Sequence, residues 1–131
     1  RKIQMTDYLN KWFWIKDRSG ILDPIARDQW FIRGWEALQC IEEKEDSVVL
    51  CYRNSSRILP TLKSVLEERP APSFLPNEKV RVIKKDLYAV VKQYLWHYND
   101  QYYYYMLADE NGKMLKKRYM ADELEKVELA K

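Results

Sequence analysis

The stretch from Leu87 to Ala108, LYAVVKQYLWHYNDQYYYYMLA, most strongly constrains what this chain can fold into. It is rich in Val, Leu, Tyr and Trp, and it carries no signal of a helix. Aromatic and β-branched residues favour strands. Asn99 and Asp100 interrupt the run with residue types that favour tight turns. The stretch therefore predicts two antiparallel strands joined by a two-residue turn at Asn99–Asp100.

This turn places Trp96 opposite Tyr103, and alternation then sorts the side chains into two rows. One face of the hairpin carries Tyr94, Trp96, Tyr103, Tyr105 and Leu107. The other face carries Leu95, His97, Tyr102, Tyr104 and Met106. A barrel has a single interior, so one row must point away from it. Three roles are open for the outward row: cross-strand stabilisation alone, packing against another part of the chain, or ligand binding.

Short β-favouring segments flank the hairpin. EKVRVI alternates apolar and polar residues and predicts a strand before it. Asn111 and Gly112 are expected to supply the two left-handed residues of a type I′ turn. The segments KMLKKRYM and ADELEKV then predict a further strand, one helical turn and a last short strand. This order, a five-stranded meander with a helical turn before the final strand, predicts a small SH3-like barrel.

The same pattern occurs earlier in the chain. Residues Trp35–Ile41 and Ser47–Tyr52 form a strand-like pair, and SRILPTLKSVLEE follows it as KRYMADELEKVEL follows the later pair. Aligning Arg57 with Arg118 brings Leu62 close to Leu124, which favours a diverged tandem repeat over chance similarity. Prolines 70, 72 and 76 predict an extended connector. We therefore expect two units, residues 1–70 and residues 71–131.

The segment before this pair, residues 1–34, gives two further expectations. DYLNKWFWIKD favours a strand with Trp12 and Trp14 on one face. Asp23 and Pro24 are typical of a helix start, as the N-cap and the first helical residue. Gly34 is typical of a helix end. A loop and a strand of the first barrel remain the alternative for this segment.

Catalysis and metal binding find little support. His97 is the only histidine, and no Ser or Cys motif near it suggests a nucleophile–base pair. Cys40 and Cys51 are the only cysteines, which are too few for a four-ligand zinc site. We expect them to be reduced and to face each other across neighbouring strands. The chain is therefore predicted not to be an enzyme, and to carry no metal and no cofactor.

Charge and hydropathy narrow the class of partner. The net charge is +3 over 131 residues and is evenly spread, whereas DNA-binding proteins usually have a stronger positive bias. The apolar runs are far shorter than a membrane span, and no secretory segment is visible. We expect a cytoplasmic protein without a membrane partner. The sequence begins at Arg1 rather than Met, which leaves room for an upstream segment.

The order of elements in residues 74–129 resembles Tudor, chromo-barrel and related SH3-like domains. FLPNEKVRVIKK, LYAVVKQYLWH and YYYYMLADENGK are similar to the opening, the second strand and the central hairpin of these families. The combination of WH, YYYY, GK and KRY, followed by an acidic residue and Leu, also resembles a group of bacterial proteins with tandem SH3-like units. One departure concerns the first turn, where Pro76, Asn77 and Glu78 replace the glycine and acidic residue common in Tudor domains. The resemblance implies two SH3-like or Tudor-like barrels in tandem.

Three binding functions compete. The Tudor resemblance implies an aromatic cage for methylated Lys or Arg, formed by Tyr88, Trp96, Tyr103, Tyr105 and Tyr119. Rings beside Lys113, Lys116, Lys117 and Arg118 would suit RNA or a single strand of nucleic acid. Aromatic rows, together with the acidic segment Glu42–Asp46, would suit a protein partner, because Tyr and Trp are enriched at interface cores.

We expect a protein partner before a nucleic acid, with the chain acting as an adaptor or as an immunity-type inhibitor of a toxin. The candidate binding residues combine the aromatic side chains of both hairpin faces with the basic cluster of the following strand. They are Tyr88, Trp96, His97, Tyr102, Tyr103, Tyr104, Tyr105, Lys116, Lys117, Arg118 and Tyr119.

Overall fold

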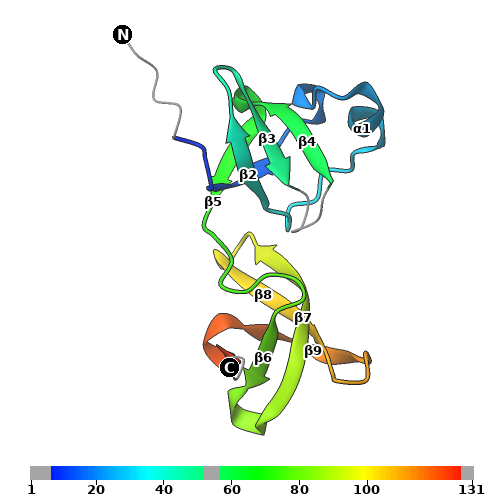
Figure 1. Ribbon diagram of the computed structural model, residues 1–131, viewed down its shortest axis with the longest axis vertical. Helices are drawn as coiled ribbons and strands as arrows, with labels where there is room; N and C mark the ends of the chain where they lie inside the picture. Colours follow the sequence, from blue (N-terminus) through cyan, green and yellow to red (C-terminus); the bar gives the residue numbers. More distant parts are fainter. Residues whose placement is uncertain (1–6, 52–56, 128–131) are drawn as a thin grey trace. The chain divides into compact units, whose positions relative to one another are not determined.

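The computed structural model describes residues 7–51 and 57–127, and it shows a mainly β protein (Figure 1). The chain divides into two compact units, Arg1–Ala71 and Pro72–Lys131. Each unit contains one antiparallel sheet of five strands. The described residues include one α-helix, the short α1 (Pro24–Gln29) of the first unit. The prediction of a mainly β chain with short helical turns is confirmed to this extent.

The sheet of the first unit has the strand order β4-β3-β2-β1-β5. Its strands are β1 (Trp12–Ile15), β2 (Leu38–Glu43), β3 (Ser47–Cys51), β4 (Ile58–Leu62) and β5 (Leu66–Arg69). A 3₁₀ turn, η1 (Arg18–Gly20), and α1 lie between β1 and β2. One face of the sheet forms a core with α1 through Phe13, Ile15, Ile21, Ala26, Trp30, Leu38, Cys40, Val48, Leu50 and Leu59. The predicted strand at Trp12 is confirmed.

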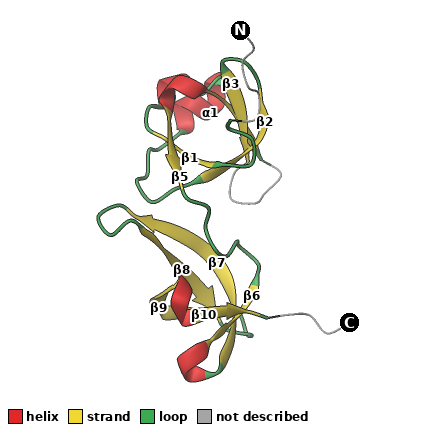
Figure 2. Ribbon diagram, turned by 90° about the vertical axis from the view of Figure 1, so that its left-hand side faces the viewer, coloured by secondary structure: helices red, strands yellow, loops and turns green. Residues whose placement is uncertain are grey.

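The sheet of the second unit has the order β10-β6-β7-β8-β9. Its strands are β6 (Lys79–Val82), β7 (Leu87–His97), β8 (Tyr102–Ala108), β9 (Met114–Met120) and β10 (Leu124–Lys126). Counted within each unit, both sheets therefore run fifth, first, second, third, fourth. Each unit also has a 3₁₀ turn before its last strand, η2 (Lys63–Val65) and η4 (Ala121–Glu123), and a further one, η3 (Ile83–Lys85), joins β6 to β7 (Figure 2).

The two last strands correct the alignment made from sequence. Leu66 begins β5 and Leu124 begins β10, each directly after its 3₁₀ turn. Leu62 instead precedes η2, as Met120 precedes η4. The expected match of Leu62 with Leu124 is therefore wrong, because the structural equivalent of Leu124 is Leu66. The sequence has a leucine on each side of the short turn, and the turn itself has no distinctive motif.

The β7–β8 hairpin has the predicted register. Trp96 pairs with Tyr103, and His97 pairs with Tyr102. The turn differs from the prediction, since residues 98–101 form a four-residue loop. The Gln101 backbone N–H donates to the His97 carbonyl at 2.8 Å, and Gln101 adopts a left-handed φ of 61°. The register survives because this loop closes on the same pair of residues.

Two other local predictions need correction in the loops that follow β8 and α1. Gly112 is left-handed, with a φ of 85°, but Asn111 is not among the residues of positive φ, so the turn is not type I′. The Asp109 carboxylate accepts hydrogen bonds from the backbone N–H groups of Asn111 and Lys113, both at 2.9 Å, and shapes this loop instead. Helix α1 begins as predicted but ends at Gln29, well before Gly34.

The N-cap of α1 and the β2–β3 register complete the comparison. The Asp23 carboxylate accepts hydrogen bonds from the N–H groups of Ile25 and Ala26, as an N-cap residue should. Cys40 pairs with Leu50 and not with Cys51, which lies opposite Gln39. The predicted cysteine pairing is therefore wrong by one residue, because a bulge between Cys40 and Glu42 shifts the register.

Candidate functional site

The first of the two predicted aromatic rows lies in the core of the second unit. Tyr94, Trp96, Tyr103 and Tyr105 are all buried, and Tyr119 on β9 joins them. The rings of Tyr94 and Trp96 each pack edge to face against Tyr103, with 4.9 Å between the centroids of Trp96 and Tyr103. A cage needs ring faces that a ligand can reach. The cage implied by the Tudor resemblance is therefore not formed, since four of its five rings fill the core.

Tyr105 shows how firmly this row is held. Its ring is fully buried and packs at right angles against Phe74, with 5.3 Å between the centroids. Its hydroxyl accepts a hydrogen bond from the Ser73 backbone N–H at 2.7 Å. The ring therefore ties the segment before β6 to the middle of the sheet, and its role is structural.

The second row is only partly outward, since Leu95 is buried while the remaining members are partly or fully exposed. Its rings, His97, Tyr102 and Tyr104, form what we call the ring cluster. The centroids of His97 and Tyr104 are 5.3 Å apart, and those of Tyr102 and Tyr104 are 5.2 Å apart. The two tyrosine hydroxyls lie 3.0 Å apart and share a hydrogen bond. Tyr102 is 38% exposed. Three rings are therefore held together on an accessible face of β7 and β8.

The loop at residues 98–101 places polar groups at the edge of the ring cluster. Tyr102 also donates from its hydroxyl to the Asp100 carboxylate at 3.3 Å. The hydrogen bond with Tyr104, some loss of solvation and the Asp100 charge together raise the pKa of Tyr102 to about 12. The Asp100 backbone N–H donates to Nδ1 of His97 at 3.2 Å. The ring cluster thus presents apolar ring surface with polar groups at its edge.

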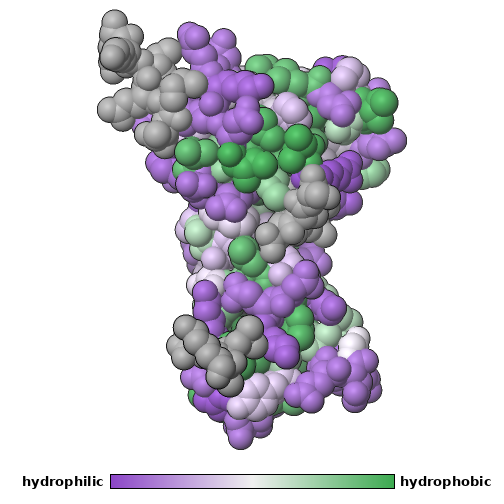
Figure 3. Space-filling view, viewed as in Figure 1, coloured by the Kyte–Doolittle hydropathy of each residue, from purple (hydrophilic) through white to green (hydrophobic). Residues whose placement is uncertain are grey.

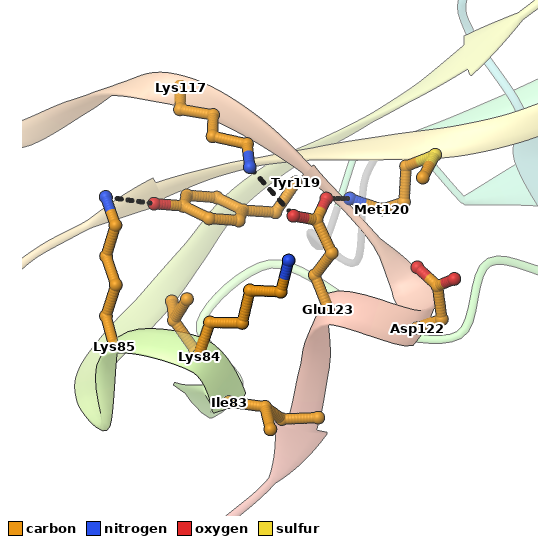
Figure 4. A pocket seen from close by; sticks show the side chains of 9 residues that line it. Ile83, Lys84, Lys85, Lys117, Tyr119, Met120, Asp122 and Glu123 are labelled. Carbon is orange, nitrogen blue, oxygen red and sulfur yellow. Dashed lines mark hydrogen bonds and ion pairs between the residues drawn. The ribbon is translucent and has the colours of Figure 1, made fainter.

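A pocket of about 450 Å³ lies elsewhere in the second unit, between η3, the end of β9 and η4 (Figure 4). Its lining consists of Val82, Ile83, Lys84, Lys85, Lys117, Tyr119, Met120, Asp122 and Glu123. We call it the lysine pocket. Tyr119 lines this space although its side chain is almost fully buried. The lysines come from two segments that the fold brings together from distant parts of the sequence.

The lysines already occupy the positions that a cationic ligand would take. Nζ of Lys117 lies 4.9 Å from the centroid of the Tyr119 ring, and Nζ of Lys85 lies 6.0 Å from it. Lys85 also donates to the Tyr119 hydroxyl at 3.4 Å. A methylated Lys or Arg entering here would meet like charges. The lysine pocket is therefore no substitute for the missing cage.

Acidic residues compensate part of this positive charge. Glu123 accepts a hydrogen bond from Lys117 at 2.8 Å and another from the Met120 backbone N–H at 3.0 Å. These two bonds lower the pKa of Glu123, and the same carboxylate raises the pKa of Lys117. Lys117 is thus engaged within the chain, which reduces what it can offer to a phosphate backbone.

The remaining predicted residues belong neither to the three residues of the ring cluster nor to the lining of the lysine pocket. Lys116 is exposed on β9, and Arg118 pairs in register with Met106. Tyr88 is 48% exposed and lies opposite Arg81. Arg81 is itself bound to Glu125 and Asp86.

The first unit also exposes apolar side chains. They gather over β2, β3 and β4, where Figure 3 shows a green patch, and Ile41 and Ile58 are about half exposed there. The nearby segment Glu42–Asp46, predicted as an acidic contact surface, is partly neutralised. Glu43 binds Lys63 at 2.8 Å.

Sequence reasoning missed the lysine pocket. The segment ADELEKV predicts a helical turn at Asp122 and Glu123, but no motif links these residues to Lys84 and Lys85, which follow the strand EKVRVI. The spacing of about 35 positions between these groups gives no periodic signal. The one clue is that charged residues closely follow a strand in both segments, Lys84 and Lys85 after β6 and Asp122 and Glu123 after β9.

Among residues 7–51 and 57–127, no group of three or more His, Cys, Asp or Glu side chains is arranged to hold a metal ion. No helix in these ranges is long and apolar enough to cross a membrane. Comparison with protein-family models, with curated proteins and with solved structures finds no match.

Proposed function

We propose that this chain is a non-enzymatic binding module that recognises a protein partner through the ring cluster. The observation that carries this proposal is the division of the aromatic rows. The inner row is complete and fills the core, so the fold does not need His97, Tyr102 and Tyr104 to be buried. The chain nevertheless keeps three rings in mutual contact on an accessible face.

The physical chemistry of the ring cluster suits a protein interface. Tyrosines give large contact areas at a small entropy cost, and here mutual packing already restricts the rings before binding. Their hydroxyls can exchange hydrogen bonds at the edge of the contact. The apolar side chains exposed on β2–β4 of the first unit support a second contact of the same kind.

The fold assignment forms part of the proposal. The strand order shared by the two units and the 3₁₀ turn before each last strand support two SH3-like units derived from a tandem repeat. Modules of this size commonly serve as adaptors or inhibitors. The adaptor or immunity-type role is an inference from architecture alone.

Nucleic acid is the second candidate, supported by the exposed Lys116 and Arg118 of β9. Against it, Lys117 is paired with Glu123, and Arg81 is paired with two carboxylates. A net charge of +3 leaves few cations for phosphate contacts. We therefore place the protein partner first.

The test is affinity capture of partners from the native host, with nuclease treatment of the lysate. A Tyr102→Ala/Tyr104→Ala variant should lose the captured protein, because a central ring contributes about 2 kcal/mol or more, roughly 30-fold in affinity. Tyr88→Ala is the matched control, since it removes an exposed tyrosine outside the ring cluster. It should retain the partner.

Two results would reject the proposal. In the first, nuclease removes every captured partner, and Lys116→Ala/Lys117→Ala costs more than the tyrosine variant. Binding should then also weaken steeply between about 50 and 200 mM salt. In the second, Tyr88→Ala and the double tyrosine variant reduce capture equally.

A further inference from the structure

The lining of the lysine pocket carries more positive than negative charge. Three ammonium groups and two carboxylates line it. Lys117 and Glu123 neutralise each other at 2.8 Å. In the described part of the chain Lys84 makes no direct hydrogen bond, but its charge helps to lower the pKa of Glu123. Lys85 contacts only the neutral side chain of Tyr119, through its hydroxyl and its ring.

Figure 4 shows how these groups are arranged. The Lys84 side chain extends over the pocket toward Glu123, and Lys85 stands at the other side with its ammonium group against Tyr119. Asp122 lies beyond Glu123, away from Lys85. The Lys85 side of the pocket, away from Asp122 and Glu123, is therefore its more positive side, and Ile83 and Met120 add apolar surface.

We infer that the lysine pocket binds an acidic side chain of a peptide segment, with the carboxylate placed between Lys84 and Lys85. An apolar neighbour in the same peptide contacts Ile83 and Met120. The inference rests on the proposed function only in that a protein carries the carboxylate. The pocket volume of about 450 Å³ lies within the range of ligand sites and accommodates a short peptide segment rather than a whole domain.

Charge and donor geometry select the class of ligand. A cation is disfavoured because lysines already stand beside the Tyr119 ring. A phosphate group carries a charge of about −1.5 to −2, whereas three ammonium groups against two carboxylates leave the pocket lining an excess of about one positive charge. Arg forks would also hold phosphate in a bidentate way, which Lys cannot do. The pocket lining contains no Arg. Two compact ammonium groups beside apolar surface fit a singly charged carboxylate on an apolar stem.

The test titrates the ¹⁵N-labelled full chain with acetyl-Leu-Glu-Leu-amide and with its neutral counterpart, acetyl-Leu-Gln-Leu-amide. The Glu peptide should shift the backbone amide signals of residues 83–85 and 119–123, and the Gln peptide should not. Lys84→Gln should weaken binding of the Glu peptide about tenfold, as expected for the loss of one charge-assisted hydrogen bond. The control is Lys92→Gln, which alters an exposed lysine of β7 outside the pocket.

Three results would overturn the inference: equal shifts with both peptides, equal weakening by Lys84→Gln and Lys92→Gln, or displacement of the Glu peptide by an equal concentration of inorganic phosphate. Lys84 and Lys92 are both exposed, so neither variant should unfold the chain. Failure here is separate from failure of the proposed function. Loss of peptide binding in Lys84→Gln says nothing of partner capture by the ring cluster, which is tested through Tyr102 and Tyr104.

Discussion

Tyr104 and Tyr105 offer a direct test of which aromatic row forms the core. They are adjacent on β8, so replacing either with Ala costs a similar amount of β-propensity. Tyr105 is fully buried against Phe74, whereas Tyr104 faces outward in the ring cluster. The two variants therefore differ mainly in burial.

The expected loss of stability follows from these surroundings. Deleting a buried aromatic side chain costs about 3–5 kcal/mol of unfolding free energy, and we expect this for Tyr105→Ala. Tyr104→Ala removes its ring pairs with His97 and Tyr102, worth up to about 1 kcal/mol each, so its loss should be about 1–2 kcal/mol. Because domains are stable by only about 5–15 kcal/mol, Tyr105→Phe is the milder third variant. It keeps the ring, loses the hydrogen bond from Ser73, and should cost about 1 kcal/mol.

Urea unfolding measures these differences in the full chain. The indole N–H signal of Trp96 is the probe, since Trp96 is the only tryptophan in residues 72–131 and reports on the second unit alone. The midpoint should fall sharply for Tyr105→Ala and slightly for Tyr104→Ala, with a similar slope. Equal losses for the two variants, or a larger loss for Tyr104→Ala, would refute the assignment of the inner and outer rows.

Two further predictions concern pH. Burial raises the pKa of Glu43, but hydrogen bonds from Lys63 and a backbone N–H outweigh this effect and lower the pKa below 4.5. The stabilisation from the Glu43–Lys63 pair should therefore be present above pH 4.5 and lost as the pH falls through the lowered pKa. Acid unfolding of Glu43→Gln should not show this loss. Ultraviolet titration should show Tyr102 ionising near pH 12. The contribution of the raised pKa to the stability of the fold should therefore be complete below pH 10 and disappear between about pH 10 and 12. A lower pKa of Tyr102 in Tyr104→Phe would confirm that the hydrogen bond with Tyr104 raises it, and an unchanged pKa would contradict this.

The sequence alone determined the register of the β7–β8 hairpin. Side chains alternate with a period of two, and a short polar loop between two β-favouring runs leaves few ways to pair them. The same local chemistry identified the start of α1, because Asp23 and Pro24 satisfy the first N–H groups of a helix. It also predicted the helical turn before β10. These features depend on residues that are close in sequence.

Loop geometry was less predictable. The four-residue loop after His97 and the Asp109-centred loop replaced two expected tight turns. Each depends on side-chain or backbone hydrogen bonds that compete closely in energy with the standard turn types. The bulge between Cys40 and Glu42 likewise shifts the β2–β3 register by one residue from the register that the positions of the two cysteines suggest.

Only the tertiary structure decided which aromatic row lies inside. Alternation defines two rows but does not orient them, since both contain tyrosines; the choice depends on what the other strands and Phe74 bring against the sheet. The lysine pocket is decided in the same way. Lys84 and Glu123 lie far apart in sequence and meet because β6 pairs with β10, which places η3 beside η4. Long-range packing therefore decides which row of the hairpin faces outward as the ring cluster, and long-range strand pairing creates the lysine pocket.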